Sequence, residues 1–157
     1  MSNTHHYSLL LKWTGNIGSG TSDYKSYLRS HQIIIENKTV IEATSDKAFR
    51  GDASKHNPEE LLLASVSSCH MLWYLHICAD AGVVVVEYTD KPTGELEITS
   101  NGSGRFTEII LRPDIYVTKD SMIEKAISLH EKAHQMCFIA NSVNFPIKIL
   151  GNVFVKR

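Results

Sequence analysis

The sequence of 157 residues has the length of one ordinary domain, and 43% of its residues are hydrophobic, which is enough for a core. Its 16 Lys and Arg nearly balance its 17 Asp and Glu, and no block of like charge forms a patch for a nucleic acid or a membrane surface. The N-terminus lacks a basic region followed by a long apolar stretch, and no run reaches the ~20 apolar residues of a membrane helix. We therefore expect a cytoplasmic protein with a single domain at 1–157, and neither nucleic acid nor membrane among its partners.

Taken in chain order, the first predicted elements are strands at 7–13 and 31–44. A turn at Asn37 and Lys38 splits the second segment into a hairpin. A loop rich in Gly and Ser, residues 14–26, separates the two segments.

A long helix is predicted next, at 58–81. Asn57 can cap it, Pro58 suits its first position and two glutamates complement the helix dipole. It should end near Gly82, after 24 residues or ~36 Å at ~1.5 Å per residue. Apolar side chains occupy nearly every face of its middle, and a small domain can rarely bury such a helix alone. We expect a partner subunit to cover part of it.

The rest of the chain predicts further strands and a second helix. The strands are expected at 83–88, 94–100, 106–117 and 146–155. In the helix, Ser121 and Glu124 have the spacing of a capping box. They are followed by a stripe of residues, namely Ile123, Ala126, Ile127, His130, His134 and Cys137. Each half thus runs from strands into a long helix that carries a cysteine, which predicts an α+β fold with segregated helices.

The three cysteines are too few for a disulfide scaffold, so a disulfide in a reducing compartment would be transient and functional. On the first helix, Cys69 and Cys78 are nine residues and therefore ~180° apart at ~100° per residue, so they cannot serve one site. Cys78 is predicted to be a small buried apolar residue, the usual place of a free cysteine. Cys69 lies too far from the helix N-terminus for the dipole to lower its pKa much, so a thiolate there would need a nearby cation.

Two stretches of the sequence carry a family resemblance. "NPEELLLASVSSC" at 57–69 and "AHQMCFIANSV" at 133–143 resemble the signature pair of the OsmC/Ohr family of thiol peroxidases. The segment 13–33 is also similar to the N-terminal part of one OsmC-like branch. The resemblance implies an intertwined homodimer, with antiparallel sheets wrapped around two long central helices, that reduces organic hydroperoxides through a cysteine pair.

The resemblance also implies roles for individual residues. Cys69 would be the peroxidatic cysteine and Cys137 the resolving one, and Glu59 would orient an arginine beside the thiolate. Arg29 is the choice for this arginine from its order along the chain, and Arg50, just ahead of the helix, is the alternative. Ten helical residues, or ~15 Å, separate Glu59 from Cys69, so either Glu59 acts across the dimer interface or an arginine bridges the gap.

The implied chemistry needs no cofactor. A thiolate attacks the peroxide O–O bond, becomes a sulfenic acid and condenses with a second thiol to a disulfide, which an external thiol or dithiol reductant then resets. Apolar side chains around Cys69 favour an alkyl or fatty-acid hydroperoxide over hydrogen peroxide. His70, Trp73 and His76 depart from the best-known branches and predict a pocket of different shape and polarity.

Two alternatives remain open at this stage. The first is a binding or redox-sensing module on the same fold, whose thiols bind a thiol-containing or electrophilic ligand without turnover. The second is a metal site, because His130 and His134 stand at i and i+4 upstream of Cys137 and could supply three ligands. No CxxC or HExxH motif supports the metal site, and a site without metal is the prediction.

Overall fold

The computed structural model describes residues 4–156, whose contacts divide the chain into two compact units. Residues up to Leu62 belong to the first unit and residues from Leu63 onward to the second. Each unit is described by itself, and the single-domain boundary of 1–157 stays a prediction.

The first unit contains a three-stranded antiparallel sheet, β1 (Leu10–Trp13), β2 (His31–Ile34) and β3 (Ile41–Ala43), in that order. The predicted hairpin is confirmed. Its turn places Asn37 at φ 59°, in the left-handed region that asparagine tolerates. A short 3₁₀ helix, η1 (Lys47–Phe49), follows the sheet.

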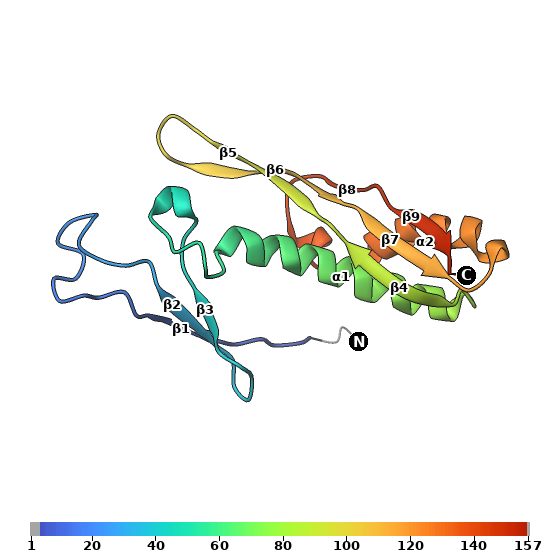
Figure 1. The fold of residues 1–157 in the computed structure, drawn as a ribbon, viewed down its shortest axis with the longest axis horizontal. Helices are drawn as coiled ribbons and strands as arrows, with labels where there is room; N and C mark the ends of the chain where they lie inside the picture. The colour runs from blue at the N-terminus through green and yellow to red at the C-terminus, as the bar shows by residue number, and fades with distance from the viewer. Residues whose placement is uncertain (1–3, 157) are drawn as a thin grey trace. The chain divides into compact units, whose positions relative to one another are not determined.

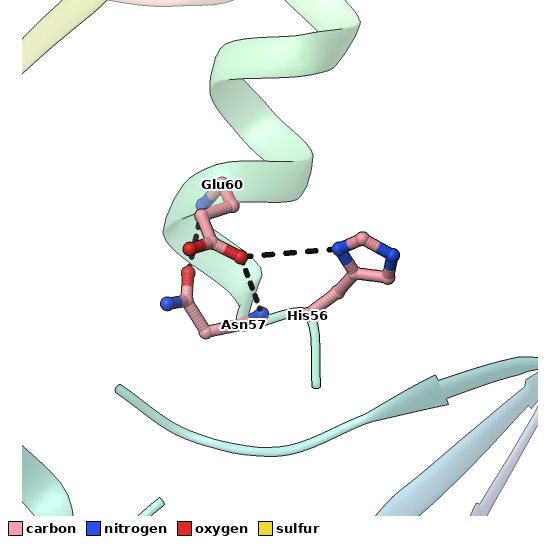
Figure 2. A network of polar contacts seen from close by, with 3 residues as sticks. All are labelled: His56, Asn57 and Glu60. Atoms are coloured by element: carbon pink, nitrogen blue, oxygen red, sulfur yellow. Dashed lines mark hydrogen bonds and ion pairs between the residues drawn. The ribbon is translucent and has the colours of Figure 1, made fainter. Parts of the chain in front are cut away.

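The long helix α1 (Pro58–Asp80) begins and ends where the sequence predicts. Glu60 donates its backbone N–H to Asn57 Oδ1 at 2.8 Å, and Asn57 donates its own to Glu60 Oε2 at 3.3 Å (Figure 2). This reciprocal pair satisfies two N–H groups that the helix leaves without partners. At the other end Gly82 adopts φ 72°, and Val83 donates to the carbonyl of Cys78 at 2.9 Å, which is the Schellman arrangement.

The second unit contains two three-stranded sheets that continue into one another (Figure 1). One sheet has the order β4-β7-β9 and the other β5-β6-β8, with the last strand of each parallel to its neighbour. The strands are β4 (Val85–Asp90), β5 (Thr93–Ile98), β6 (Gly104–Leu111), β7 (Pro113–Val117), β8 (Ile147–Ile149) and β9 (Asn152–Val155).

The predicted single strands at 106–117 and 146–155 are therefore each two strands. The first breaks at Arg112, whose N–H bonds to Asp90 Oδ1 at 2.7 Å instead of to a neighbouring strand. Pro113 follows and has no N–H to offer. Asp90 Oδ2 also accepts from Ser67 Oγ on α1 at 2.6 Å, so this junction is fixed to the helix.

The second helix, α2 (Ile123–Met136), follows a 3₁₀ turn, η2 (Asp120–Met122). The capping box predicted for Ser121 is wrong, because Ser121 lies inside that turn and the cap residue, Met122, makes no side-chain cap hydrogen bond. Both helices pack on the β4-β7-β9 sheet, in a core of eight buried residues: Tyr74, Ile77, Cys78, Val83, Ile115, Val117, Ala126 and Ala133. The predicted burial of Cys78 is confirmed.

Much of α1 remains open. Within its most apolar 18-residue window only 28% of the residues are buried. By length and composition alone this helix is also long and apolar enough to cross a membrane. The core helices of soluble proteins share this length and composition. The exposure agrees with the expected partner subunit, which stays a prediction.

Candidate active site

The contact between α1 and α2 brings two of the predicted site residues together. Cys137 ends α2 as its C-cap, with φ −69° and ψ 108°, so it leaves the helical stripe on which the sequence placed it. Its thiol lies within hydrogen-bonding reach of the Cys69 thiol on α1. Both cysteines are free, so the pair is present as two thiols.

The two thiols have different surroundings. Cys137 is fully buried, and burial first, then its hydrogen bond with Cys69, raises its pKa to about 11. The N–H of Ala140 donates to Cys137 Sγ at 3.4 Å and opposes part of this rise. Cys69 is only half-buried. A molecule from solvent can therefore reach Cys69, whereas Cys137 stays protonated and screened at neutral pH.

Beside the thiols lies a buried pair of histidines. His70 Nε2 is 3.0 Å from His130 Nδ1, and the two rings lie edge to edge and nearly coplanar, with their centroids 5.3 Å apart and their planes at 8°. Tyr74 stacks on His130 at 4.2 Å and donates its hydroxyl to the carbonyl of Ala126 at 3.0 Å. Along these contacts the residue numbers increase on α1, from Cys69 to Tyr74, and decrease on α2, from Cys137 to Ala126. The two helices are therefore antiparallel here.

Both imidazoles are neutral at physiological pH. Burial, with smaller contributions from the neighbouring His130 and His134, lowers the pKa of His70 to about 4, and burial lowers the pKa of His130 to about 4. A neutral pair has one N–H to share at its contact, and in either tautomer a second N–H remains, on His70 Nδ1 or His130 Nε2. Among residues 4–156 neither atom has a hydrogen-bond partner.

The sequence showed these histidines but not their pairing. The i,i+4 spacing of His130 and His134 suggested metal ligands with Cys137. Within residues 4–156, however, no group of three or more His, Cys, Asp or Glu side chains is arranged to hold a metal ion. His130 instead pairs with His70, which lies 60 positions earlier, and no spacing in the local sequence predicts that contact.

The remaining predicted residues belong to the first unit. Arg29 donates to the carbonyls of Tyr27 and Tyr24 at 2.6 and 2.7 Å, and its guanidinium lies about 4 Å from both of their rings. Arg50 is exposed and lines the same cavity as Arg29, of about 230 Å³. Glu59 Oε2 is buried without a hydrogen-bond partner, and no ion pair joins Glu59 to an arginine in the part of the chain that the structure describes.

Comparison with known proteins places this chain in a family. The model of the family described as OsmC-like protein matches residues 51–150. An OsmC-like protein of unknown function from Vibrio cholerae is 28% identical, with a TM-score of 0.83 over 96% of this chain and 100% of that one. An organic hydroperoxide resistance protein from Elizabethkingia anophelis shares the fold at 22% identity, with a TM-score of 0.69 over 98% of this chain and 100% of the other.

An uncharacterised protein of Bacillus subtilis, YmaD, is 22% identical over 97% of this chain and 95% of its own length. Since the family model covers well over half of the sequence, the chain belongs to the OsmC-like family, as the resemblance at 57–69 and 133–143 predicted. The mixed α and β architecture of these relatives is confirmed for this chain.

Proposed function

We propose that this protein is a thiol-dependent peroxidase that reduces organic hydroperoxides. The observation that carries the proposal is the contact between a half-exposed Cys69 thiol and a fully buried Cys137 thiol. A peroxidase of this kind needs one thiol that meets the substrate and a second that waits, screened from it. The names of relatives support the substrate class, since proteins of this fold from Elizabethkingia anophelis and Legionella pneumophila are called organic hydroperoxide resistance proteins.

In the proposed cycle the Cys69 thiolate attacks the terminal oxygen of the hydroperoxide. An S–O bond forms, the O–O bond breaks, and the alkoxide leaves and takes a proton from water, so that Cys69 becomes a sulfenic acid. The Cys137 thiol then attacks this sulfur, and the hydroxyl departs as water with the thiol's proton. The resulting Cys69–Cys137 disulfide is returned to two thiols by an external thiol or dithiol reductant.

The proposed cycle needs a cation that stabilises the Cys69 thiolate. Arg29 is the candidate cation, because its guanidinium is already held in place by two carbonyls and two rings. Glu59 would orient it, since its buried Oε2 accepts no hydrogen bond from the residues that the structure describes. The working enzyme would be a homodimer, since α1 leaves most of its apolar residues open in one chain.

Peroxide consumption by single-cysteine variants tests this function. Cys69→Ser should lower the consumption of cumene hydroperoxide to background, because a serine hydroxyl without a strong base does not attack an O–O bond usefully. Cys137→Ser should keep one rapid turnover and then lose activity as Cys69 over-oxidises to the sulfinic acid. Cys78→Ser is the matched control and should keep wild-type rates.

If wild type and Cys69→Ser consume peroxide equally slowly, the peroxidase proposal is wrong. A binding or redox-sensing module that uses the same dithiol would then be the better account. Titration of reduced protein with a disulfide or an electrophile, followed by mass spectrometry, would show whether it forms a stable adduct without turnover.

A further inference from the structure

A small hollow lies on α1, about one helical turn beyond Cys69. It has a volume of about 230 Å³ and is lined by Leu72, Trp73 and His76. These residues follow Cys69 by three, four and seven positions, which places them on the same face of the helix. A molecule bound by its apolar part in this hollow would therefore have its reactive end near the Cys69 thiol.

The wall of the hollow is aromatic. The Trp73 ring stands edge-on to Phe138, with centroids 5.4 Å apart and planes at 84°, and edge-on to His76 at 5.7 Å and 85°. Phe138 directly follows Cys137, so this wall adjoins both cysteines. In a single chain Leu72 and Phe138 are 62% and 65% exposed, so a ligand can use their apolar surface where the partner subunit of the proposed dimer leaves them open.

The apolar part of the hollow is short. At one helical turn beyond Trp73, His76 Nε2 meets Asp80 Oδ2 at 3.4 Å, and both side chains are exposed. A long acyl chain that continued in this direction would run over a polar pair and lose the benefit of burial. The volume also lies below the ~300–1,000 Å³ of pockets for drug-sized ligands. The space suits a compact apolar group.

We propose that Trp73 selects hydroperoxides with a compact aromatic body over those of long-chain fatty acids. An aryl ring in the hollow completes an edge-to-face cluster with Trp73 and Phe138, while its hydroperoxide group points to Cys69. This inference rests on the proposed function and narrows its substrate class. It also departs from the expectation, drawn from the sequence, that fatty-acid hydroperoxides suit this site.

Specificity constants of the intact protein test the inference. Wild type should prefer cumene hydroperoxide to tert-butyl hydroperoxide, and both to linoleic acid hydroperoxide. Trp73→Leu should reduce the ratio of kcat/KM for cumene over tert-butyl hydroperoxide by about 2- to 13-fold, the worth of one aromatic pair. Trp73→Phe keeps a ring and should retain most of the preference.

Phe154→Leu provides the matched control. It breaks another aromatic pair, with Tyr116 at 5.3 Å, on strand positions that alternate with those facing the core. This variant should leave the ratio unchanged. An unchanged ratio in Trp73→Leu, or a wild-type preference for the linoleic acid hydroperoxide, would overturn the inference.

A binding measurement separates the inference from the proposed function. The alcohol formed from cumene hydroperoxide, 2-phenyl-2-propanol, cannot react with a thiol and can be titrated by NMR into Cys69→Ser protein. Binding that is several-fold weaker in Cys69→Ser/Trp73→Leu supports the aromatic site even if no peroxide is consumed. Equal affinity in the two proteins contradicts it even if peroxides are reduced.

Discussion

The buried histidine pair should make the protein sensitive to acid. Each imidazole titrates near pH 6.5 in the unfolded chain and near 4 in the fold, because burial disfavours its charged form. Between these values the unfolded chain binds more protons, so the free energy of unfolding falls as the pH is lowered. Stability is full above about pH 6.5, and this loss is complete once the pH passes below about 4.

The magnitude follows from the size of the pKa change. A fall from 6.5 to about 4 corresponds to about 3 kcal/mol for one imidazole, of which about 2 kcal/mol is already lost at pH 5. His70 and His130 share one contact at 3.0 Å, so the loss for the pair should lie between one and two times this amount. Other groups also titrate in this range, and only a comparison with variants isolates the pair.

The double variant His70→Gln/His130→Asn removes both titrating rings. Glutamine can place its amide near the position of Nε2, and asparagine near that of Nδ1, so an interhelical hydrogen bond can still form. Urea unfolding at pH 7.5 and pH 5, followed by circular dichroism, should show a loss at least about 2 kcal/mol smaller in this variant than in wild type. His76→Gln changes an exposed histidine and should behave as wild type does. The reasoning is refuted if wild type and the double variant lose the same stability between the two pH values.

The other predictions concern the cysteines, the arginine and the assembly. After mild peroxide treatment, peptide mapping should find Cys69 joined to Cys137 within one chain and Cys78 free, and a disulfide from Cys69 to Cys78 would contradict the placement of these two residues on opposite faces of α1. Arg29→Ala should slow the oxidation of Cys69 in stopped-flow measurements by leaving its thiolate less stabilised, whereas Arg50→Ala should not, and the reverse result would move the catalytic assignment to Arg50. The proposed dimer should bury well above the ~1,600 Å² of a standard interface. Light scattering at micromolar concentration should therefore give the mass of a dimer, and the mass of a monomer would exclude the proposed assembly.

Local chemistry explains why α1 could be predicted within one residue. Asn57 and Glu60 close its start, and Gly82 closes its end, through contacts between residues that are near in sequence. The second helix shows the opposite case. The spacing of Ser121 and Glu124 fits a capping box, but the chain forms a 3₁₀ turn there, and the packing of α2 on the sheet decides where the helix begins. Short-range patterns succeed where no tertiary contact competes with them.

The strands show a similar limit. The alternation of apolar residues at 106–117 predicts one strand. This alternation continues through the break, because residues on both sides of Arg112 are buried in hydrophobic clusters. The break itself depends on Asp90, more than twenty residues earlier, whose carboxylate takes the Arg112 N–H. The local sequence pattern does not show where a distant side chain, and not a neighbouring strand, accepts a backbone hydrogen bond.

In the candidate site, helical periodicity separates two kinds of chemistry on α1. Cys69 and His70 are neighbours in the sequence and therefore ~100° apart around the helix. The face of Cys69 continues through Trp73 and remains partly open to solvent, whereas His70 turns into the contact with α2. Sequence spacing could identify the first face, since all of its residues lie on one helix. It could not identify the face of His70, because the partner of that residue, His130, lies on the other helix.

The same arrangement has a consequence for how the cysteines work together. The thiols can approach each other only while α1 and α2 keep their register, and that register is fixed just beyond them by the His70–His130 contact and the Tyr74 hydrogen bond to Ala126. Both contacts are buried, so they resist exchange with water. A change that shifts α2 along α1 by one turn, ~5.4 Å, would remove Cys137 from reach of Cys69 without touching either thiol. The polar contacts inside the helix pair therefore matter for the proposed disulfide chemistry as well as for the stability of the fold.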